Sequence, residues 1–436
     1  MPLEAHCGTF LKPSTGAPFT QAITGLGFSP AAILFWSSNL NTDATFTPDL
    51  YFSFGFCDDA GNENCFATFS NDNAATSDTG CAIRSDAIMA CGSGGSTEWR
   101  GSVTTIGADG FTFTWHENNA DTAYINYLAL GGDGIVNSHV STFNFTTAGG
   151  AQTVTGVGFT PNFVMMFTTP NTSNDTTNAS ASWGLGCAKS ATEEWAISAR
   201  SQDNQGTSAT SRYQITDGCL TRIATAGGID FEIDFTSFGS GQFTFNKSNA
   251  PSDVDLVAYL ALQLSVAGDV AVGSFNTATA TGNQTVTATT TNSNMAAFLT
   301  TFNNVSSASE VTNNRVSMGA AHSMTPAGVV SHENNVWSGD TDNEPDTIAV
   351  AYHTENDTVI CAVEDATAAD TTIGARGDIT QFGANNYTIN WAIKDATAYQ
   401  VLHIVFAAAT EAGGGGGPST PSAVTGMVMM GEGGYY

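Results

Sequence analysis

The fold is decided by the stretch Gly110-Phe111-Thr112-Phe113-Thr114-Trp115, which is followed by Tyr127-Leu128-Ala129-Leu130-Gly131-Gly132. Both halves alternate with the period of two that is typical of β-strands, and a polar segment separates them. The pattern returns as Phe243-Thr244-Phe245-Asn246 with Tyr259-Leu260-Ala261-Leu262, and as Tyr387-Thr388-Ile389-Asn390-Trp391 with His403-Ile404-Val405-Phe406. The differences 127 − 111, 259 − 243 and 403 − 387 all equal 16. We interpret each copy as a pair of closing strands, so the chain is three copies of one β-domain.

A second motif repeats near the start of the first two copies. Gln21-Ala22-Ile23-Thr24-Gly25-Leu26-Gly27-Phe28-Ser29-Pro30 returns, at an offset of 131, as Gln152-Thr153-Val154-Thr155-Gly156-Val157-Gly158-Phe159-Thr160-Pro161. This pattern predicts a strand, a glycine turn and a proline that ends pairing before a second strand. The second strand, Ile33 to Trp36 or Phe163 to Phe167, is apolar on both faces, so we expect it at the centre of a sandwich. The third copy keeps only Gln284-Thr285-Val286-Thr287.

These repeats predict an all-β protein of three tandem β-sandwich domains, with a jelly-roll-like form as one option. We place repeat one at residues 1–134, repeat two at 135–268 and a divergent repeat three at 269–411, followed by a glycine-rich linker and tail at 412–436. Short linkers predict domains that touch in a fixed orientation. Three such domains can surround a pseudo-threefold axis or stack as a rod. We expect the polar middle segments, 58–97, 188–218 and 322–346, to form surface loops and short edge strands that contact partners.

The charge balance excludes partners that are bound through phosphate groups. Among 436 residues the chain has 11 Lys and Arg against 40 Asp and Glu, a formal net charge of −29. Binding to nucleic acid depends on Lys and Arg that release counterions, and the chain has no basic run. We therefore expect neither a nucleic-acid partner nor contact with an anionic membrane. No run approaches the ~18 apolar residues of a membrane span, and the first residues lack a secretory signal, so we expect synthesis in a cytoplasm.

The eight cysteines leave two interpretations open. Synthesis in a cytoplasm favours buried, reduced thiols. Alternatively, if Cys57 and Cys187 are equivalent, the bridges Cys57–Cys91 and Cys187–Cys219 form after release, with Cys65–Cys81 as a loop clip. Cys361 then has no partner.

Motifs for chemistry are weak, so we predict neither an enzyme nor a cofactor. Asp78-Thr79-Gly80 resembles half of an aspartic-protease site, but the chemistry needs two such carboxylates. The oxygen ligands Asp340, Asp342, Glu344 and Asp346 alternate as in a weak calcium loop, yet Pro345 stands where a turn glycine is needed and Ala351 where a glutamate is needed. A solvated acidic loop is the favoured interpretation. The seven histidines have no metal-binding spacing.

Two further groups of residues are candidates for binding and assembly. Trp99 and Trp337 lie in variable polar regions of repeats one and three and are weak candidates for stacking on a glycan. The tail carries apolar residues that we expect a neighbouring subunit to hold, namely Met427, Met429, Met430, Tyr435 and Tyr436.

The repeated motifs resemble the β-domains of virion surface proteins of tailed bacteriophages. In repeat one the residues that carry the resemblance are Gly27, Phe28, Pro30, Gly110, Phe111, Trp115, Tyr127 and Gly131. Repeat two has Lys247 in place of the tryptophan, and repeat three keeps only the closing strands. The resemblance implies a non-enzymatic structural protein on the virion surface, made in the host cytoplasm, as a head-decoration, tail or fibre component. Its implied partners are copies of itself and other virion proteins. The alternative is an adhesin or an array of carbohydrate-binding modules that recognises a host-surface glycan.

Overall fold

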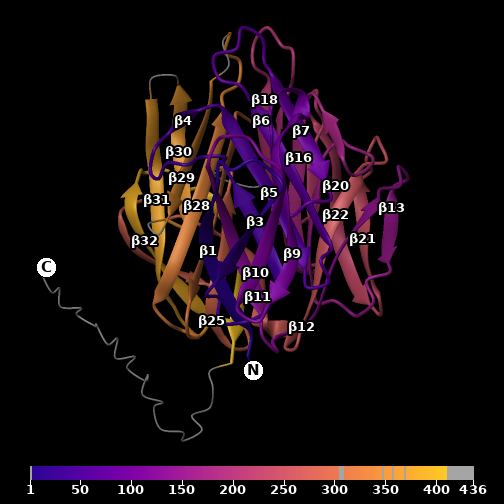
Figure 1. Cartoon of the computed structure of the whole chain (residues 1–436), viewed down its shortest axis with the longest axis vertical. Coiled ribbons are helices and arrows are strands. Elements are labelled where there is room, and N and C mark those ends of the chain that lie inside the picture. Colours follow the sequence, from indigo (N-terminus) through magenta and orange to yellow (C-terminus); the bar gives the residue numbers. More distant parts are fainter. Residues whose placement is uncertain (1, 304–308, 346–347, 356–357, 368–369, 410–436) are drawn as a thin grey trace, which may run out of the picture.

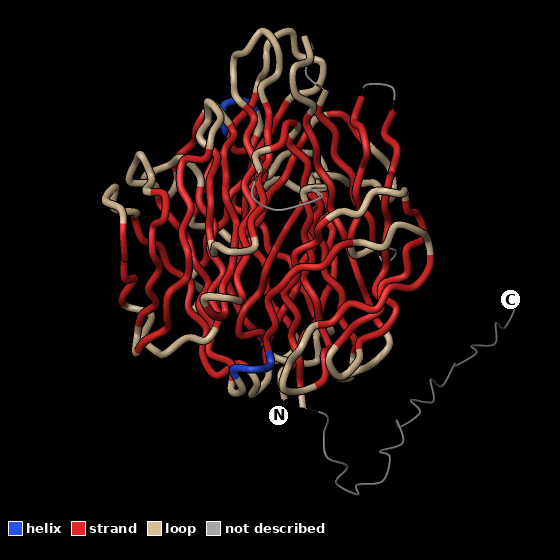
Figure 2. Tube along the Cα trace, turned by 180° about the vertical axis from the view of Figure 1, so that it is seen from behind, coloured by secondary structure: helices blue, strands red, loops and turns tan. Residues whose placement is uncertain are grey.

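The computed structural model describes residues 2–409, except 304–308, 346–347, 356–357 and 368–369, and confirms the all-β prediction. Strands fill the body of the described chain, with two short 3-10 turns at Ser93–Gly95 and Ala267–Asp269 (Figure 2). The three repeats lie side by side, coloured indigo to purple, magenta to pink, and orange to yellow in Figure 1. The predicted tail, residues 412–436, lies outside the described residues.

Each repeat contributes strands in the same order. Repeat one contains β1 (Glu4–Lys12), β2 (Phe19–Thr24), β3 (Pro30–Ser37), β4 (Thr47–Pro48), β5 (Leu50–Asp58), β6 (Glu63–Ser70), β7 (Thr79–Arg84), β8 (Ile88–Cys91), β9 (Thr97–Gly107), β10 (Gly110–Glu117) and β11 (Ala123–Gly131). Repeat two contains β12 (Ile135–Asn144), β13 (Gly150–Thr155), β14 (Phe163–Thr168), β15 (Thr176–Asn178), β16 (Ala181–Ser190), β17 (Glu193–Ser201), β18 (Thr210–Ile215), β19 (Leu220–Ile223), β20 (Ile229–Gly239), β21 (Gln242–Asn249) and β22 (Leu256–Leu264). Repeat three contains β23 (Val270–Asn276), β24 (Gly282–Thr287), β25 (Ser293–Thr301), β26 (Val311–Thr312), β27 (Asn314–Ser323), β28 (Val330–Asp340), β29 (Ala349–Glu355), β30 (Ile360–Thr367), β31 (Asp370–Phe382), β32 (Asn386–Lys394) and β33 (Gln400–Ala408).

Every repeat is a sandwich of a four-stranded sheet and a seven-stranded sheet. The four-stranded sheets have the orders β2-β10-β9-β8, β13-β21-β20-β19 and β24-β32-β31-β30. The seven-stranded sheets have the orders β1-β11-β3-β5-β6-β7-β15, β12-β22-β14-β16-β17-β18-β26 and β23-β33-β25-β27-β28-β29-β4. The last strand of each seven-stranded sheet therefore comes from a different repeat.

This strand exchange is cyclic. Repeat two supplies β15 to β7 of repeat one, repeat three supplies β26 to β18 of repeat two, and repeat one supplies β4 to β29 of repeat three. Each donated strand is short and covers an edge whose backbone groups would otherwise be open to pairing with another chain. The three repeats therefore form a closed ring, which is the pseudo-threefold alternative and not the rod.

The constant spacing of 16 residues has a physical cause, but it is not strand pairing. β10 belongs to the four-stranded sheet and β11 to the seven-stranded sheet, so the expected closing pair is two strands that face each other across the sandwich. Their rings meet edge to face, with centroids 5.5 Å apart for Phe111 and Tyr127. The equivalent distances are 5.2 Å for Phe243–Tyr259 and 5.8 Å for Tyr387–His403. Aromatic pairs favour this geometry, and it fixes how the chain crosses between the layers.

The glutamine of the second motif makes the same two kinds of hydrogen bond in all three repeats and so links neighbouring strands. Its side-chain nitrogen donates to the backbone near the end of the first strand, from Gln21 to Leu11, from Gln152 to Asn144 and from Gln284 to Asn276. Its side-chain oxygen accepts a hydrogen bond from Trp115, Lys247 or Trp391. The exchange of tryptophan for lysine therefore conserves an N–H donor to the same glutamine.

The doubly apolar strand is central, as predicted, but only one of its faces is covered by the sandwich. In β3, Ile33 and Phe35 point into the core between the two sheets of repeat one. The alternate residues Leu34 and Trp36 point the other way, into a core shared by all three repeats. Because successive side chains of a strand point to opposite faces, both faces of β3 are buried.

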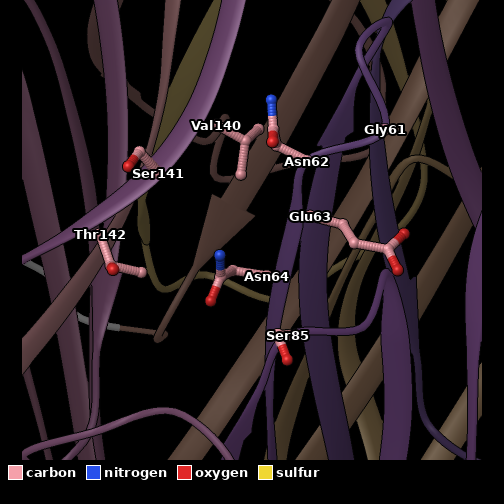
Figure 3. Close-up of a pocket in the computed structure, with 8 residues that line it drawn as sticks. All are labelled: Gly61, Asn62, Glu63, Asn64, Ser85, Val140, Ser141 and Thr142. Carbon is pink, nitrogen blue, oxygen red and sulfur yellow. The ribbon is translucent and has the colours of Figure 1, made fainter. Parts of the chain in front are cut away.

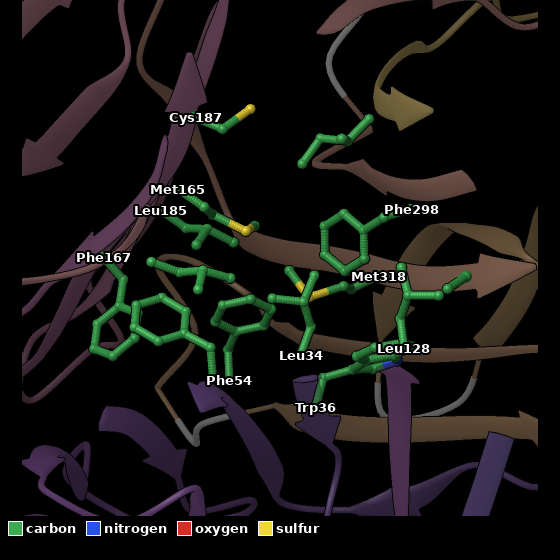
Figure 4. Close-up of a cluster of buried hydrophobic side chains, with 14 of the residues drawn as sticks. Leu34, Trp36, Phe54, Leu128, Met165, Phe167, Leu185, Cys187, Phe298 and Met318 are labelled. Carbon is green, nitrogen blue, oxygen red and sulfur yellow. The ribbon is translucent and has the colours of Figure 1, made fainter. Parts of the chain in front are cut away.

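The shared core lies where the three seven-stranded sheets meet (Figure 4). The Phe54 ring of repeat one is 6.2 Å from Phe167 of repeat two and 6.1 Å from Phe298 of repeat three, measured between centroids. Trp36 meets Phe298 edge to face at 5.6 Å. Trp183 of repeat two meets Phe302 of repeat three at the same distance. The repeats are therefore fused by hydrophobic packing and are not independent modules.

The prediction that the polar middle segments form surface loops and short edge strands is wrong for a large part of each segment. They contain β6, β17 and β28, which are interior strands of the seven-stranded sheets and are almost entirely buried. Some of their polar side chains hydrogen-bond to a neighbouring repeat, as Ser70 and Ser201 do to Asp340 and Asn334 does to the Gly8 carbonyl. Polarity in these strands therefore reflects hydrogen bonding inside the protein more than contact with water.

Truncation of Phe54 tests the shared core. We expect Phe54→Ala to lower the free energy of unfolding by about 3–5 kcal/mol, because it opens a cavity that all three repeats line. Denaturant unfolding followed by tryptophan fluorescence and by circular dichroism measures the loss, and both probes should report one transition. Leu11→Ala, at a residue 42% exposed, is the control and should change stability by less than about 1 kcal/mol. Separate transitions for the repeats would contradict the shared core.

Candidate functional site: the seams between the repeats

Three aspartates at equivalent positions join each repeat to the next. Asp203 accepts a hydrogen bond from the backbone N–H of Thr79, at 3.2 Å, and Asp342 accepts one from Thr210, at 2.7 Å. Asp72 accepts the third, from Ala349, at 3.0 Å. Each donor, Thr79, Thr210 or Ala349, is the first residue of its strand, β7, β18 or β29. The carboxylates therefore satisfy the N–H groups at which these strands begin.

Side chains from all three repeats meet at a fourth carboxyl group, that of Asp340. Ser70, Ser201 and Asp340 are the last residues of β6, β17 and β28. Asp340 Oδ2 accepts hydrogen bonds from Ser70 Oγ at 2.7 Å and from Ser201 Oγ at 2.9 Å. Asp340 is 1% exposed, and this burial raises its pKa to about 7. Hydrogen bonds of this kind fix the mutual register of the three sheets.

The structure does not assemble the candidate calcium loop. Asp340 is buried at the end of β28, so the interpretation as a solvated loop is wrong for this residue, and Asp342 caps β18. The backbone N–H of Glu344 donates to Ser208 Oγ at 3.0 Å, and Asp346 lies outside the described residues. Across the described ranges, no group of three or more His, Cys, Asp or Glu residues is placed to hold a metal ion.

The two tryptophans proposed as glycan platforms are inaccessible, and that prediction is wrong. Trp99 and Trp337 are both 0% exposed. Trp99 packs in the core of repeat one and donates from Nε1 to Asn39 Oδ1 at 2.7 Å. Phe46 of repeat one meets Trp337 of repeat three edge to face at 6.1 Å. Both rings therefore stabilise the body, and neither can stack on a sugar.

All eight cysteines are buried with free thiols, and none of the three proposed disulfides is formed. Cys187 points into the shared core and Cys219 into the core of repeat two, on opposite sides of the same sheet. Cys81 pairs with Thr68, three residues from Cys65, so these two side chains also point to opposite faces. Cys91 packs with Cys65, whereas Cys57 lies in the core of repeat one.

The alignment behind the proposed disulfides was displaced by one residue. Cys57 pairs with Ile33, and the equivalent Val164 pairs with Ala188, so the counterpart of Cys57 is Ala188 and not Cys187. A displacement of one residue moves a side chain to the other face of a strand.

The seam between repeats three and one is closed without a covalent link. The backbone N–H of Cys7 donates to His322 Nδ1 at 3.1 Å, and Asn334 Nδ2 donates to the Gly8 carbonyl at 2.9 Å. The His6 ring lies 4.7 Å from the His322 ring, measured between centroids. His332 lies opposite His322 in the pairing of β27 with β28. Three imidazoles therefore gather where the ring of repeats closes.

These histidines are held neutral. Burial, reinforced by His6 and His332, lowers the pKa of His322 to about 3. Burial followed by the effect of His6 lowers the pKa of His332 to about 4. Burial also lowers the pKa of His6, although the negative charge of Asp109 acts to raise it. Protonation would place a hydrogen on His322 Nδ1, which now accepts from Cys7, so it would break this contact of the seam.

Acid should therefore weaken the seam. A pKa in the folded state below the ordinary value of 6.5 gives stability that is present at neutral pH and lost as the pH falls toward about 3. We expect His322→Gln, which offers an oxygen acceptor and does not titrate, to lose about 3 kcal/mol less stability than the unsubstituted protein between pH 6.5 and pH 4.

Denaturant unfolding at both pH values measures this difference, and His116→Gln, at an exposed histidine, is the matched control. The variants must be compared because buried carboxyl groups change the pH dependence of stability in the opposite direction from the histidines. Burial raises the pKa of Glu63 to about 8 and of Glu194 to about 7, so their contribution to stability increases on acidification. Identical pH profiles for His322→Gln and the unsubstituted protein would contradict the assignment.

A polar groove of about 340 Å³ lies at the seam between repeats one and two (Figure 3). Residues 61–64 and Ser85 form one side, and residues 140–142 of β12 form the other. Glu63 accepts a hydrogen bond from the Val103 N–H at 3.0 Å, beside an irregularity in the pairing of β9 with β10. The equivalent bonds run from Phe235 to Glu194 at 2.8 Å and from Ile379 to Glu333 at 3.0 Å. Since this bond recurs in every repeat, Glu63 serves to join the two sheets.

The joining residues were missed by sequence reasoning, although a signal was present. Ser70-Asn71-Asp72 and Ser201-Gln202-Asp203 are separated by the same offset of 131 as the opening motif, and Asp340-Thr341-Asp342 follows the same pattern with aspartate for serine. Comparison of the polar segments between repeats would have identified them.

Comparisons with known proteins supply no relative on which to base a function. No protein-family model matches the chain, and no curated protein matches its sequence. One solved structure that the chain matches is a β-fructofuranosidase from Schwanniomyces occidentalis complexed with fructosyl-erythritol, with a TM-score of 0.13 and 8% identity over 90% of this chain and 95% of that chain. A TM-score this low supports no inference about the fold or the function of this chain. Within the described part of the chain, no helix has the length and apolar character needed to cross a membrane.

Proposed function

We propose that this chain is a non-enzymatic structural protein on the outer surface of a tailed-phage virion, as a head-decoration, tail or fibre component. The observation that supports the proposal most is the closed ring of three repeats, in which each seven-stranded sheet is completed by a strand of another repeat. Such a body has the form of a trimer but is made from one chain. It suits a position on a symmetric particle where three neighbours meet.

The differences between the repeats add to this argument. Equivalent aspartates make the same contact at each seam, but the outer surfaces differ, since repeat three has diverged most from the other two. A trimer of identical chains offers three identical sides. A single chain with three unlike repeats can contact three unlike neighbours and keeps their stoichiometry fixed.

Charge favours a position facing outward. A net charge of −29 is repelled by packaged DNA and keeps a particle rich in β-strands soluble. The donated strands β4, β15 and β26 cover sheet edges within the chain, which limits uncontrolled pairing between copies at high local concentration.

Quantitative mass spectrometry of purified particles tests the proposal. We expect the chain to be present in fixed copy number, with hundreds of copies for head decoration or a tail tube and a few for a fibre. Antibodies against the folded protein should label intact particles, because the proposed position is external. Absence from washed particles, or labelling only after the particles are opened, would contradict a role on the virion surface. A glycan array that retains the protein would instead favour the adhesin alternative.

A further inference from the structure

An apolar groove lies beside the seam at which the ring closes. Its volume is about 380 Å³, and its lining includes Leu3 from the start of the chain, Met295, Met324 and Pro326 from repeat three, and Ala409. Met324 is 72% exposed and is one of the few large apolar residues in the described chain that lie open to solvent. Figure 1 shows the N-terminus and the yellow end of the described chain close together at the lower end of the body. The groove thus lies where the described chain both starts and ends.

At this seam the described chain has no linker between the repeats, unlike at the other two seams. Between repeats one and two the backbone runs directly from β11, which ends at Gly131, to β12, which begins at Ile135. Between repeats two and three a 3-10 turn, Ala267–Asp269, connects β22 to β23. At the third seam β33 ends at Ala408 and β1 begins at Glu4, with no covalent connection. Among the described residues no linker passes through the third seam, and Met324 beside it is 72% exposed.

The rest of the chain starts at this groove. After Ala409 there are 27 residues, since 436 − 409 = 27, and they include Gly413–Gly417 and the apolar run Met427-Val428-Met429-Met430. Methionine side chains are flexible and polarisable, so they fill irregular apolar grooves well. The groove itself is partly lined by methionine, and Glu4 supplies its single charged lining residue. Its chemistry therefore fits the apolar run of the tail.

We propose that Met427–Met430 of the same chain occupies this groove and covers the seam between repeats three and one. This inference does not depend on the virion proposal, since it concerns the free protein. It gives the apolar run a defined site on the body from which it originates.

The length of the tether favours the same chain over a neighbour. Met427 is 18 residues beyond Ala409, since 427 − 409 = 18, and the root-mean-square span of a glycine-rich chain of that length is about 21–25 Å. A compact body of this size is about 56 Å across, and 18 residues reach about 60 Å only when fully extended. A tail that starts at its own groove meets it at an effective concentration in the millimolar range.

Hydrogen exchange of the full-length protein, read by mass spectrometry of peptides covering residues 419–436, tests this proposal. We expect exchange at residues 427–430 to be slowed at least about tenfold relative to the variant Met324→Asp, which places a charge in the groove. The protection should be the same at about 1 μM and about 100 μM protein, as an intramolecular contact requires.

Val329→Asp is the matched control, because Val329 is also 72% exposed but lines a different groove. Protection should survive this substitution. A second variant, Met427→Ser with Met429→Ser and Met430→Ser, should increase the oxidation rate of Met324 by peroxide severalfold, because the groove loses its cover. Absence of protection in the unsubstituted protein would overturn the proposal. Protection that appears only at high concentration would assign the groove to a second copy, and equal loss in Val329→Asp would remove the groove as the site.

Discussion

Burial of both faces of the seven-stranded sheets is the constraint on which the rest of this structure depends. In each repeat, one face of the sheet covers the sandwich core, and the other carries large apolar side chains such as Trp36, Phe167 and Phe298. A single repeat would expose that second face to water, which is unfavourable by roughly 25 cal/mol for each Å² of apolar surface. The three repeats bury these faces against one another, so the stable unit is the whole chain. The strand exchange and the carboxylate contacts at the seams follow from this arrangement, because they are formed only when the three sheets have met.

The ring is closed by different means at its three seams. Two seams have a covalent linker between consecutive repeats, whereas the third depends on contacts between β1 and repeat three, with His322 at their centre. The third seam also carries the neutral histidines and the apolar groove at which the tail begins. Three neutral histidines and an apolar groove therefore share the seam at which the described chain has no linker between repeats.

Sequence alone was sufficient for the all-β class and for the central position of β3, because period-two patterns show directly which residues are apolar on which face. The spacing of 16 identified an invariant feature, but periodicity cannot distinguish two strands that pair from two that face each other, and Phe111 and Tyr127 do the latter. Burial of Ser70 and Asp340 was missed for a related reason, since a polar residue satisfied by a neighbouring repeat has the same appearance in a single segment as one satisfied by water, and only the recurrence of the pattern in all three repeats marks these positions. The proposed cysteine pairing is wrong because it treats Cys187 as the counterpart of Cys57, whereas the counterpart is the next residue, Ala188. Trp99 and Trp337 were misplaced because exposure was inferred from polar neighbours in the sequence, which in the fold are themselves buried.

Small-angle X-ray scattering of the purified protein tests the closed ring most directly. Three fused repeats form a compact body, for which the radius of gyration is expected to be about 22 Å. Three domains of the same size stacked as a rod would instead give about 33 Å, by the same scaling applied to each domain. A monomer with the smaller value supports a ring closed by the shared core around Phe54. A monomer with the larger value would contradict it.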